Sequence, residues 1–366
     1  MALLEQTLRQ IRPLDFTLAK LAHARLDQLT KPRGSLGRLE ELAVRCVLIT
    51  GQERPRVDGK VLFVFCADHG VSAMGVSAYP QEVTAQMVYN FLRGGAAITV
   101  LARQLNITVH VVDLGVNADF DPQFPGLIQS KIGRGTANLA EGPAMSRQAA
   151  LRAVETGISL ADEAIRNGAQ LLGLGEMGIG NSTAAAALLS AFSGIAPEEL
   201  TGSGTGITEA TRRKKAEIVR RALISNRPDP ADPLGVLAKL GGYEIAGIVG
   251  ACLAGVARRV PVVIDGFIAT AGAWVACALH PGVKDCLLFA HLSAEQGHSR
   301  VLTALQVQPL LDLGMRLGEG TGAALGMGLV ESAVRLFNEM ATFSEAGVTD
   351  GMSGRNEDTE KRGKRE

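Results

Sequence analysis

The chain has 366 residues, with 37 basic and 37 acidic side chains, and 46% of its residues are hydrophobic. The zero net charge excludes a general electrostatic attraction to nucleic acid or to an anionic membrane, and the hydrophobic content excludes a largely disordered chain. The length allows one large domain or two ordinary ones.

The start of the chain, MALLEQTLRQIRPL, carries charges where a secretory signal needs an apolar segment, so we expect a cytoplasmic protein. The most membrane-like run, IAGIVGACLAGVA, is shorter than the roughly 20 residues that span a bilayer. The five cysteines form no CxxC pair, which favours reduced thiols over a disulfide or a metal site. We expect neither a metal nor a cofactor.

Taken in chain order, the first fifty residues predict amphipathic helices, interrupted at Pro13 and at the Gly/Pro turn in KPRGSLGRLEELA. An alternation of apolar strands and helices follows. Its first part predicts a strand at 61–70, a helix at 80–104, a strand at 107–115 and, after a Gly/Pro-rich loop, a helix at 146–168. Its second part predicts strands at 170–178, 260–266 and 286–293. It also predicts helices at 180–193, 207–226, 242–258 and 320–340, and one more helix between the last two strands.

Short strands separated by helices predict right-handed βαβ crossovers and an α/β fold, in which a parallel sheet carries helices on both faces in a Rossmann-like three-layer arrangement. Ligands of such sheets bind at the carboxyl ends of the strands. The candidates for chemistry are therefore the polar residues that end the predicted strands: Asp68, His69, Asp113, Glu176, Asp265, His291 and Ser293.

Three glycine-rich turns precede predicted helices: LGEMGIGNSTAAAALL at 174–189, GSGTGIT at 202–208 and LGEGTGAALG at 317–326. Each offers backbone N–H groups and small hydroxyls to a phosphate, and Asn181 or Ser182 is the expected N-cap in the first. None matches a Walker A motif or a dinucleotide fingerprint. Together they favour a phosphate-bearing ligand over simple helix–strand packing.

Glu176 and Glu319 both follow Leu-Gly inside these turns. Two roles are open for them: capping a helix N-terminus, or acid–base chemistry with a pKa raised by burial. Because a helix N-terminus lowers the pKa of a carboxyl group, desolvation must outweigh it if either residue is a base.

Other candidates are weaker. Asp68 and His69 in CADHG suggest a metal site, but no HxH, HExxH or second ligand cluster accompanies them. We expect His291 and His298 at the surface or beside the site. RRKK at 212–215 predicts a solvated helix face, from which one lysine could reach a phosphate or a carboxylate.

A series of longer motifs follows the chain in this order: KPRGSLGRLE, CADHGVSAMGVSAYPQEVT, GLGEMGIGNSTAAAAL, LGGYEIAGIVGA, VVIDGFI, HLSAEQGH and MRLGEGTGAAL. Their order resembles that of the nicotinate-nucleotide:dimethylbenzimidazole phosphoribosyltransferase family, which acts in assembly of the lower ligand of cobalamin. The resemblance extends to about residue 347. It implies a parallel α/β domain, a small helical domain built from the chain ends, and a homodimer.

The expected organisation is a helical segment of the small domain at 1–55 and a large α/β domain at 56–314. The active-site turn and closing helix follow at 315–347, and a disordered charged tail at 348–366.

The resemblance implies a glycosyl transfer: phosphoribose moves from nicotinate mononucleotide to 5,6-dimethylbenzimidazole, giving α-ribazole 5′-phosphate and nicotinate with inversion at the anomeric carbon. It places the catalytic base at Glu319, which removes the imidazole N–H proton. A second carboxylate, near the ribose, falls on Glu176. A supporting lysine falls on Lys215, with Lys214 as the alternative.

The resemblance also implies the substrate contacts. The phosphate and ribose contacts, with the neighbouring glycines of the same turns, fall on Gly178, Asn181, Ser182, Gly204, Ser293, Gly320 and Gly322. The pocket for the flat base falls on Tyr79, Met87, Met177 and Leu317. Tyr79 and Met87 replace smaller or more polar residues of some members, so benzimidazole, adenine and phenolic acceptors all stay open.

Two other functions also stay open. One is a hydrolase or phosphorylase that cleaves the same glycosidic bond, and the other is a sensor that binds nicotinate mononucleotide without turnover. Nicotinate release that depends on the acceptor base would distinguish the transferase from both.

Overall fold

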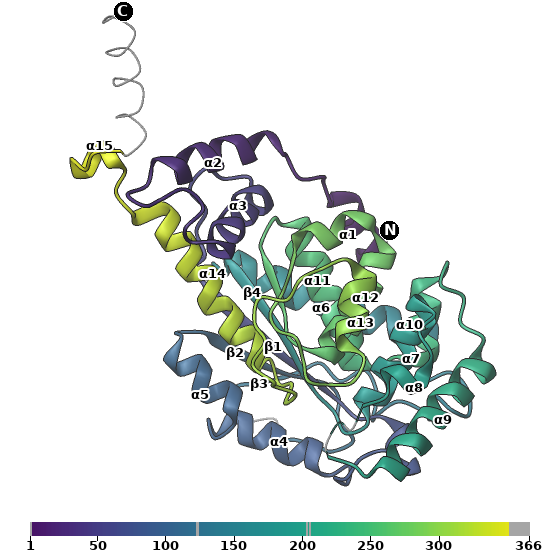
Figure 1. Cartoon of the computed structure of the whole chain (residues 1–366). Helices are drawn as coiled ribbons and strands as arrows, with labels where there is room; N and C mark the ends of the chain where they lie inside the picture. The colour runs from purple at the N-terminus through teal and green to yellow at the C-terminus, as the bar shows by residue number, and fades with distance from the viewer. Residues whose placement is uncertain (1, 122–123, 203, 205, 351–366) are drawn as a thin grey trace, which may run out of the picture. The chain divides into compact units, whose positions relative to one another are not determined.

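Six parallel strands form one sheet in the computed structural model, which describes residues 2–121, 124–202, 204 and 206–350 (Figure 1). The strands, in chain order, are β1 (Lys60–Ala67), β2 (Thr108–Gly115), β3 (Leu127–Gln129), β4 (Leu171–Met177), β5 (Val262–Ile264) and β6 (Leu287–Phe289). Their order across the sheet is β3-β2-β1-β4-β5-β6. The chain builds outward from β1 in one direction and then from β4 in the other. The junction of β1 and β4 is thus a topological switch point, where sheets of this kind bind ligands.

The helices that precede, connect and follow these strands have the following bounds: α1 (Leu3–Gln10), α2 (Thr17–Gln28), α3 (Arg38–Thr50), η1 (Gly70–Met74), α4 (Val83–Leu92), α5 (Ala97–Gln104), α6 (Arg147–Arg166), α7 (Asn181–Ser193), α8 (Pro197–Leu200), α9 (Glu209–Asn226), α10 (Pro233–Leu240), α11 (Tyr243–Ala257), α12 (Phe267–Leu279), η2 (Pro281–Cys286), α13 (His298–Leu305), α14 (Thr321–Glu339) and α15 (Phe343–Ala346). Among the described residues, no helix is long and apolar enough to cross a membrane.

Helices cover both faces of the sheet. On one face Phe65 packs against Gly247 of α11. On the other face, Gly173 of β4 lies against Met327, in the first part of α14. Successive strand residues point to opposite faces, so this arrangement confirms the predicted three-layer α/β fold.

Helices α6 and α11 approach each other unusually closely. A Cβ atom added to Gly157 would lie 2.2 Å from the carbonyl oxygen of Gly247, and one added to Gly250 would lie 2.0 Å from that of Val154. The two backbones are therefore in direct contact, which only glycine allows at these positions.

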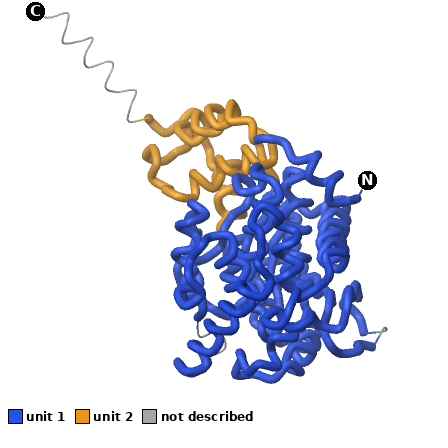
Figure 2. The backbone as a smooth tube through the Cα atoms, turned by 90° about the vertical axis from the view of Figure 1, so that its right-hand side faces the viewer, with its two compact units in different colours: residues 1–13, 57–328 blue, residues 14–56, 329–366 orange. Residues whose placement is uncertain are grey.

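The chain divides into two compact units (Figure 2). The larger holds the chain up to Pro13 and from Val57 to Gly328, including the whole sheet. The smaller is helical and holds Leu14–Arg56 and the described residues from Leu329 onward. Within it, Arg25 donates hydrogen bonds to the carbonyls of Phe337 and Asn338 at the end of α14. Helix α1 groups with the larger unit, and 351–366, most of the expected tail, lie outside the described residues.

Several predicted elements differ from the observed ones. The single helix predicted at 80–104 is wrong: α4 and α5 are separate helices, because Gly94 takes a left-handed φ of 79° between them. Strand β3 lies in a segment predicted as loop, and α8, α10 and α13 were not predicted. Strands β5 and β6 are three residues each, since the polar ends of VPVVIDG and CLLFAHLS belong to the loops that follow.

Candidate active site

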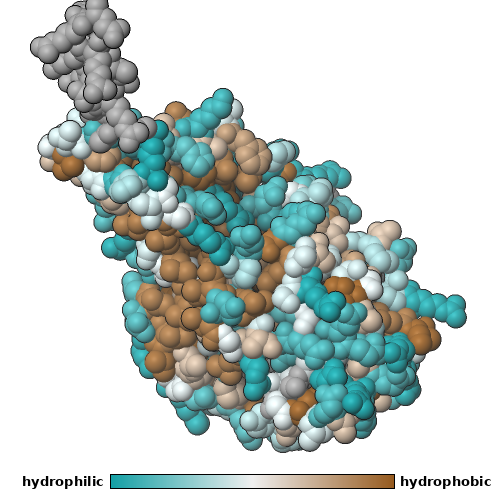
Figure 3. All heavy atoms as spheres, in the orientation of Figure 1, coloured by the Kyte–Doolittle hydropathy of each residue, from teal (hydrophilic) through white to brown (hydrophobic). Residues whose placement is uncertain are grey.

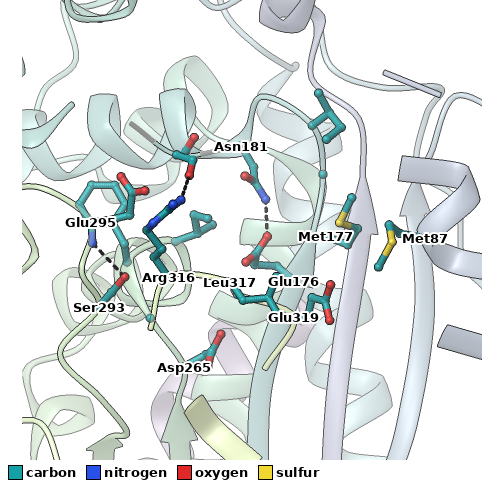
Figure 4. Close-up of a pocket in the computed structure, with 18 of the residues that line it drawn as sticks. Met87, Glu176, Met177, Asn181, Asp265, Ser293, Glu295, Arg316, Leu317 and Glu319 are labelled. Atoms are coloured by element: carbon teal, nitrogen blue, oxygen red, sulfur yellow. Dashed lines mark hydrogen bonds between the residues drawn. The ribbon is translucent and has the colours of Figure 1, made fainter. Parts of the chain in front are cut away.

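A cavity of about 770 Å³ lies at the carboxyl ends of the strands (Figure 4). β4 contributes Glu176 and Met177 to its lining, and Asp265 follows β5. His291 and Ser293 follow β6. The cavity therefore lies at the polar strand ends, where the sequence predicts ligand binding.

Glu319 reaches this cavity from a tight turn before α14. Its own φ is 64°, in the left-handed region, between Gly318 and Gly320 with φ of 82° and 89°. A Cβ atom on Gly175 would lie 2.4 Å from the Gly320 nitrogen, so strand β4 packs directly against the turn. Asp265 holds the turn from its other side, accepting the Gly320 N–H at 3.1 Å and the Ala323 N–H at 2.9 Å.

Burial raises the pKa of Glu319 to about 7, with a further contribution from the Asp265 carboxylate and opposition from the Ile98 N–H. Only 6% of the residue is exposed, and its Oε2 atom has no hydrogen-bond partner among the described residues. Desolvation thus outweighs the helix N-terminus, as a base at this position requires.

Glu176 is more deeply buried than Glu319. Burial, and then the carboxylates of Asp265, Glu244 and Glu319, raise its pKa well above the usual value, which favours the protonated form. The Asn181 side chain donates a short hydrogen bond to Oε2 of Glu176. The prediction of Asn181 or Ser182 as an N-cap is wrong: Gly180 caps α7 without a side-chain bond, and Asn181 orients the carboxyl group instead.

One end of the cavity is polar. Lys215 of α9 is almost fully buried, and its Nζ donates to the Ser182 hydroxyl at 2.8 Å. Burial lowers the pKa of Lys215 to about 8. Arg316 donates to the Gly204 carbonyl at 2.6 Å. Figure 4 shows Arg316, Ser293 and Glu295 gathered at this end.

The opposite end is apolar. Met87 and Met177 lie together there in Figure 4, on the far side of Glu176 and Glu319 from Glu295. Tyr79 and Val83 complete the apolar wall, and Leu317 is 56% exposed at the cavity lining. The two carboxyl groups therefore lie between a region suited to a flat ring and a region suited to an anion.

Most of the sequence-predicted substrate contacts line this cavity: Tyr79, Met87, Met177, Gly178, Asn181, Ser182, Gly204, Ser293 and Leu317. Gly320 and Gly322 do not line it. The Gly320 N–H is bound by Asp265, and a Cβ on Gly322 would lie 2.0 Å from the His291 ring, so both glycines serve close packing.

The structure also corrects the expected surroundings of the lysine pair. Lys214 is exposed, whereas Lys215 is buried behind Ser182 and is not itself a lining residue. Its hydrogen-bond partner is Ser182, and the charge that acts on it is Glu295 rather than Glu176.

Sequence reasoning missed several lining residues: Val83, Ile179, Gly266, Phe267, Ile268, Glu295 and Arg316. Glu295 and Arg316 stand inside the quoted motifs HLSAEQGH and MRLGEGTGAAL, which was the available signal. Neither ends a predicted strand, so the strand-end rule did not select them.

The three histidines that the sequence analysis considered, His69, His291 and His298, are buried, and His291 lines the cavity. His298 accepts the Ser293 N–H through Nδ1, and burial followed by the charge of His291 lowers the pKa of His298 to about 3. His69 pairs with Glu244 at 2.6 Å; burial would lower the pKa of His69, but the carboxylate outweighs it and the net shift is upward. Within the described residues, no group of three or more His, Cys, Asp or Glu side chains is arranged to hold a metal ion.

The chain is similar to known proteins over most of its length. A family described as phosphoribosyltransferase matches residues 11–348. Curated proteins named nicotinate-nucleotide–dimethylbenzimidazole phosphoribosyltransferase are 56% identical in Geobacter sulfurreducens, covering 96% of this chain and 99% of the relative, and 53% identical in Chloroflexus aggregans, with the same coverage. The crystal structure of CobT from Thermus thermophilus matches with a TM-score of 0.88 and 50% identity, covering 92% of this chain and 100% of that one.

Proposed function

Because the chain belongs to the nicotinate-nucleotide–dimethylbenzimidazole phosphoribosyltransferase family, we infer that it transfers phosphoribose from nicotinate mononucleotide to a benzimidazole base in cobalamin lower-ligand assembly. The products are α-ribazole 5′-phosphate and nicotinate. The observation that carries this function is the pair of buried carboxyl groups placed between an apolar and a polar end of one cavity.

We propose that Glu319 is the general base. Its unpartnered Oε2 and its pKa of about 7 suit removal of the imidazole N–H proton near neutrality. The other ring nitrogen then forms the new bond to C1′ of the ribose, and the bond from C1′ to the pyridinium nitrogen breaks. The leaving nicotinate ring becomes neutral, so its departure needs no acid.

The remaining roles follow from position. Met87, Met177 and Tyr79 suit the flat faces of the acceptor base. The α7 N-terminus, with Ser182 backed by Lys215, suits the phosphate. Glu176 lies between the two ends, and in its protonated form it can donate a hydrogen bond to the ribose.

The test is nicotinate release from nicotinate mononucleotide, with and without 5,6-dimethylbenzimidazole, by the full chain and by Glu319→Gln. We expect release only with the base present, and a loss of about 10²–10⁴-fold in kcat for the variant with nucleotide binding retained. Release without the base would indicate hydrolysis, and binding without release would indicate a sensor. Unchanged turnover in Glu319→Gln would overturn the base assignment.

We also propose that the protein is a cytoplasmic homodimer. Figure 3 shows apolar side chains gathered on the face of the larger unit that carries α5 and the first part of α14. Val100 and Leu313 are about half exposed, at 49% and 57%. A second copy of the chain, as the family resemblance implies, is the occupant that we propose for this face. The cysteines are all free, which fits a reducing compartment.

A further inference from the structure

Glu295 places a carboxyl group at the polar end of the cavity. It follows β6, lines the cavity and is 9% exposed. The Gly204 N–H donates to its carboxylate. A Cβ atom on Gly202 would lie 2.0 Å from Oε2, so the carboxylate is packed tightly against this turn. An internal anion therefore lies among the groups proposed to receive the substrate phosphate.

The charged groups that face Glu295 come from two other elements. Lys215 belongs to α9, and Arg316 to the segment before α14. Both have other partners as well, Ser182 and the Gly204 carbonyl. His298, on the helix that follows Glu295, is directed elsewhere, with its ring nitrogens at the Ser293 N–H and the Thr270 hydroxyl. Asp265 and His291 line the same cavity.

We propose that Glu295 couples binding of the nucleotide phosphate to the uptake of one proton. A phosphate monoester is mostly a dianion at neutral pH, because its second pKa is about 6. When the phosphate binds beside the buried Glu295 carboxylate, three negative charges lie near only two cations, Lys215 and Arg316. One proton shared between Glu295 and a phosphate oxygen replaces this repulsion with a hydrogen bond.

The inference rests on the proposed position of the phosphate. In its favour, burial raises the pKa of Glu295 even though Lys215 and Arg316 oppose the shift. The proton comes from solvent, no covalent bond changes, and the proton returns to solvent when the phosphorylated product leaves. Binding that takes up a proton is favoured at low pH, and its affinity falls about tenfold per pH unit while both free groups are ionised.

The experiment is calorimetry of nicotinate mononucleotide binding to the full chain, without acceptor base, in two pH 7.0 buffers of different ionisation enthalpy. We expect uptake of between about half and one proton by the unsubstituted protein. The same nucleoside without its phosphate gives no uptake. Glu295→Gln brings uptake with the nucleotide close to zero and tightens binding at pH 8 about tenfold. Glu217→Gln, an exposed carboxylate on α9, is the matched control and behaves like the unsubstituted protein.

Absence of proton uptake by the unsubstituted protein overturns the proposal, and this result does not depend on whether the variant folds. Uptake that survives in Glu295→Gln and grows between pH 7 and 8 overturns it in favour of Lys215, whose pKa is about 8. Ser182→Ala tests the phosphate position separately. Weaker nucleotide binding in that variant, together with no proton uptake in the unsubstituted protein, rejects the Glu295 coupling and leaves the proposed function standing.

Discussion

Glu319 takes a backbone conformation that a residue with a Cβ atom seldom adopts, with φ of 64°. Such a conformation costs on the order of 1–3 kcal/mol and persists only where the surroundings enforce it. Here the enforcing groups are the Asp265 carboxylate on one side of the turn and Gly175 of β4 on the other. The surrounding contacts thus hold a carboxylate at the edge of the cavity, in a backbone conformation that glycine would adopt more easily.

The pH dependence of turnover follows from this residue. A base must be deprotonated, so with a pKa of about 7 for Glu319, kcat/KM for the acceptor should fall about tenfold per pH unit below pH 7 and level off above it. Steady-state rates between pH 5.5 and 8.5 at saturating nucleotide measure this. A flat profile over that range would contradict the role of Glu319.

The two central carboxylates could be predicted from the sequence because Leu-Gly-Glu occurs twice beside glycine turns. The partners of these residues could not. Asn181 binds Glu176, and Lys215 binds Ser182, through contacts that depend on how separate helices pack. Glu295 lies beyond the end of β6, and its place in the cavity lining depends on how the loops at the strand ends fold.

At the scale of elements, the turn at the N-terminus of α14 positions Glu319, the proposed base. Asp265 follows β5 and accepts the N–H groups of Gly320 and Ala323, so a residue at the end of a strand caps the N-terminus of helix α14. Its charge also contributes to the raised pKa of Glu319. Asp265 thus both holds the turn and raises the pKa of Glu319.

Asp265→Asn tests this coupling. Asparagine has one acceptor oxygen, so one N–H loses its partner, at a cost of about 1 kcal/mol in unfolding free energy. We expect kcat to fall and the acid limb of the pH profile to move to lower pH, because the neighbouring charge is gone. The matched control is Asp113→Asn. Asp113 is also a buried carboxylate and accepts the Val116 N–H at 2.8 Å, but it does not line the cavity. This control variant should destabilise the fold without moving the limb, and an unmoved limb in Asp265→Asn would rule out the electrostatic role.

Strand ends were predictable because parallel strands place all their carboxyl ends at one edge, whichever strands are neighbours. Apolar runs gave β1, β2 and β4 nearly residue by residue. The pattern failed where the local signal is short: β3 has three residues in a Gly/Pro-rich segment, and Gly94 breaks a run whose apolar spacing continues on both sides. Such elements are fixed by tertiary pairing rather than by their own sequence.

At the scale of the whole molecule, the acidic cavity costs stability. Glu319 has a pKa of about 7 in the folded protein, above its value of about 4.3 in the unfolded chain. Its contribution to the free energy of unfolding is therefore fully present below about pH 4.3, and it is lost as the pH rises through 7 and the buried group ionises. Glu319→Gln should therefore unfold with a free energy about 3–4 kcal/mol higher than the unsubstituted protein at pH 8, and with almost no gain at pH 4.5. Denaturant unfolding at the two pH values measures this. An equal effect at both would show that the carboxylate is not destabilised by burial.

The proposed homodimer is tested through the face that carries Val100. Light scattering should give a mass of about twice 38.4 kDa for the unsubstituted chain and a shift toward 38.4 kDa for Val100→Glu, since a charge would have to be buried. Ile224→Glu is the control, because Ile224 is 67% exposed on α9. A dimer that survives Val100→Glu unchanged would assign the interface elsewhere.

The backbone contact between α6 and α11 has a consequence for how this sequence can change over time. Gly157 and Gly250 have no room for even one added carbon, although glycine-to-alanine changes in helices usually stabilise a protein. A complete substitution survey should therefore find these two positions among the least tolerant in the chain. Substitutions in the cavity lining can therefore accumulate during evolution, whereas the close spacing of α6 and α11 requires glycine to be kept at both positions.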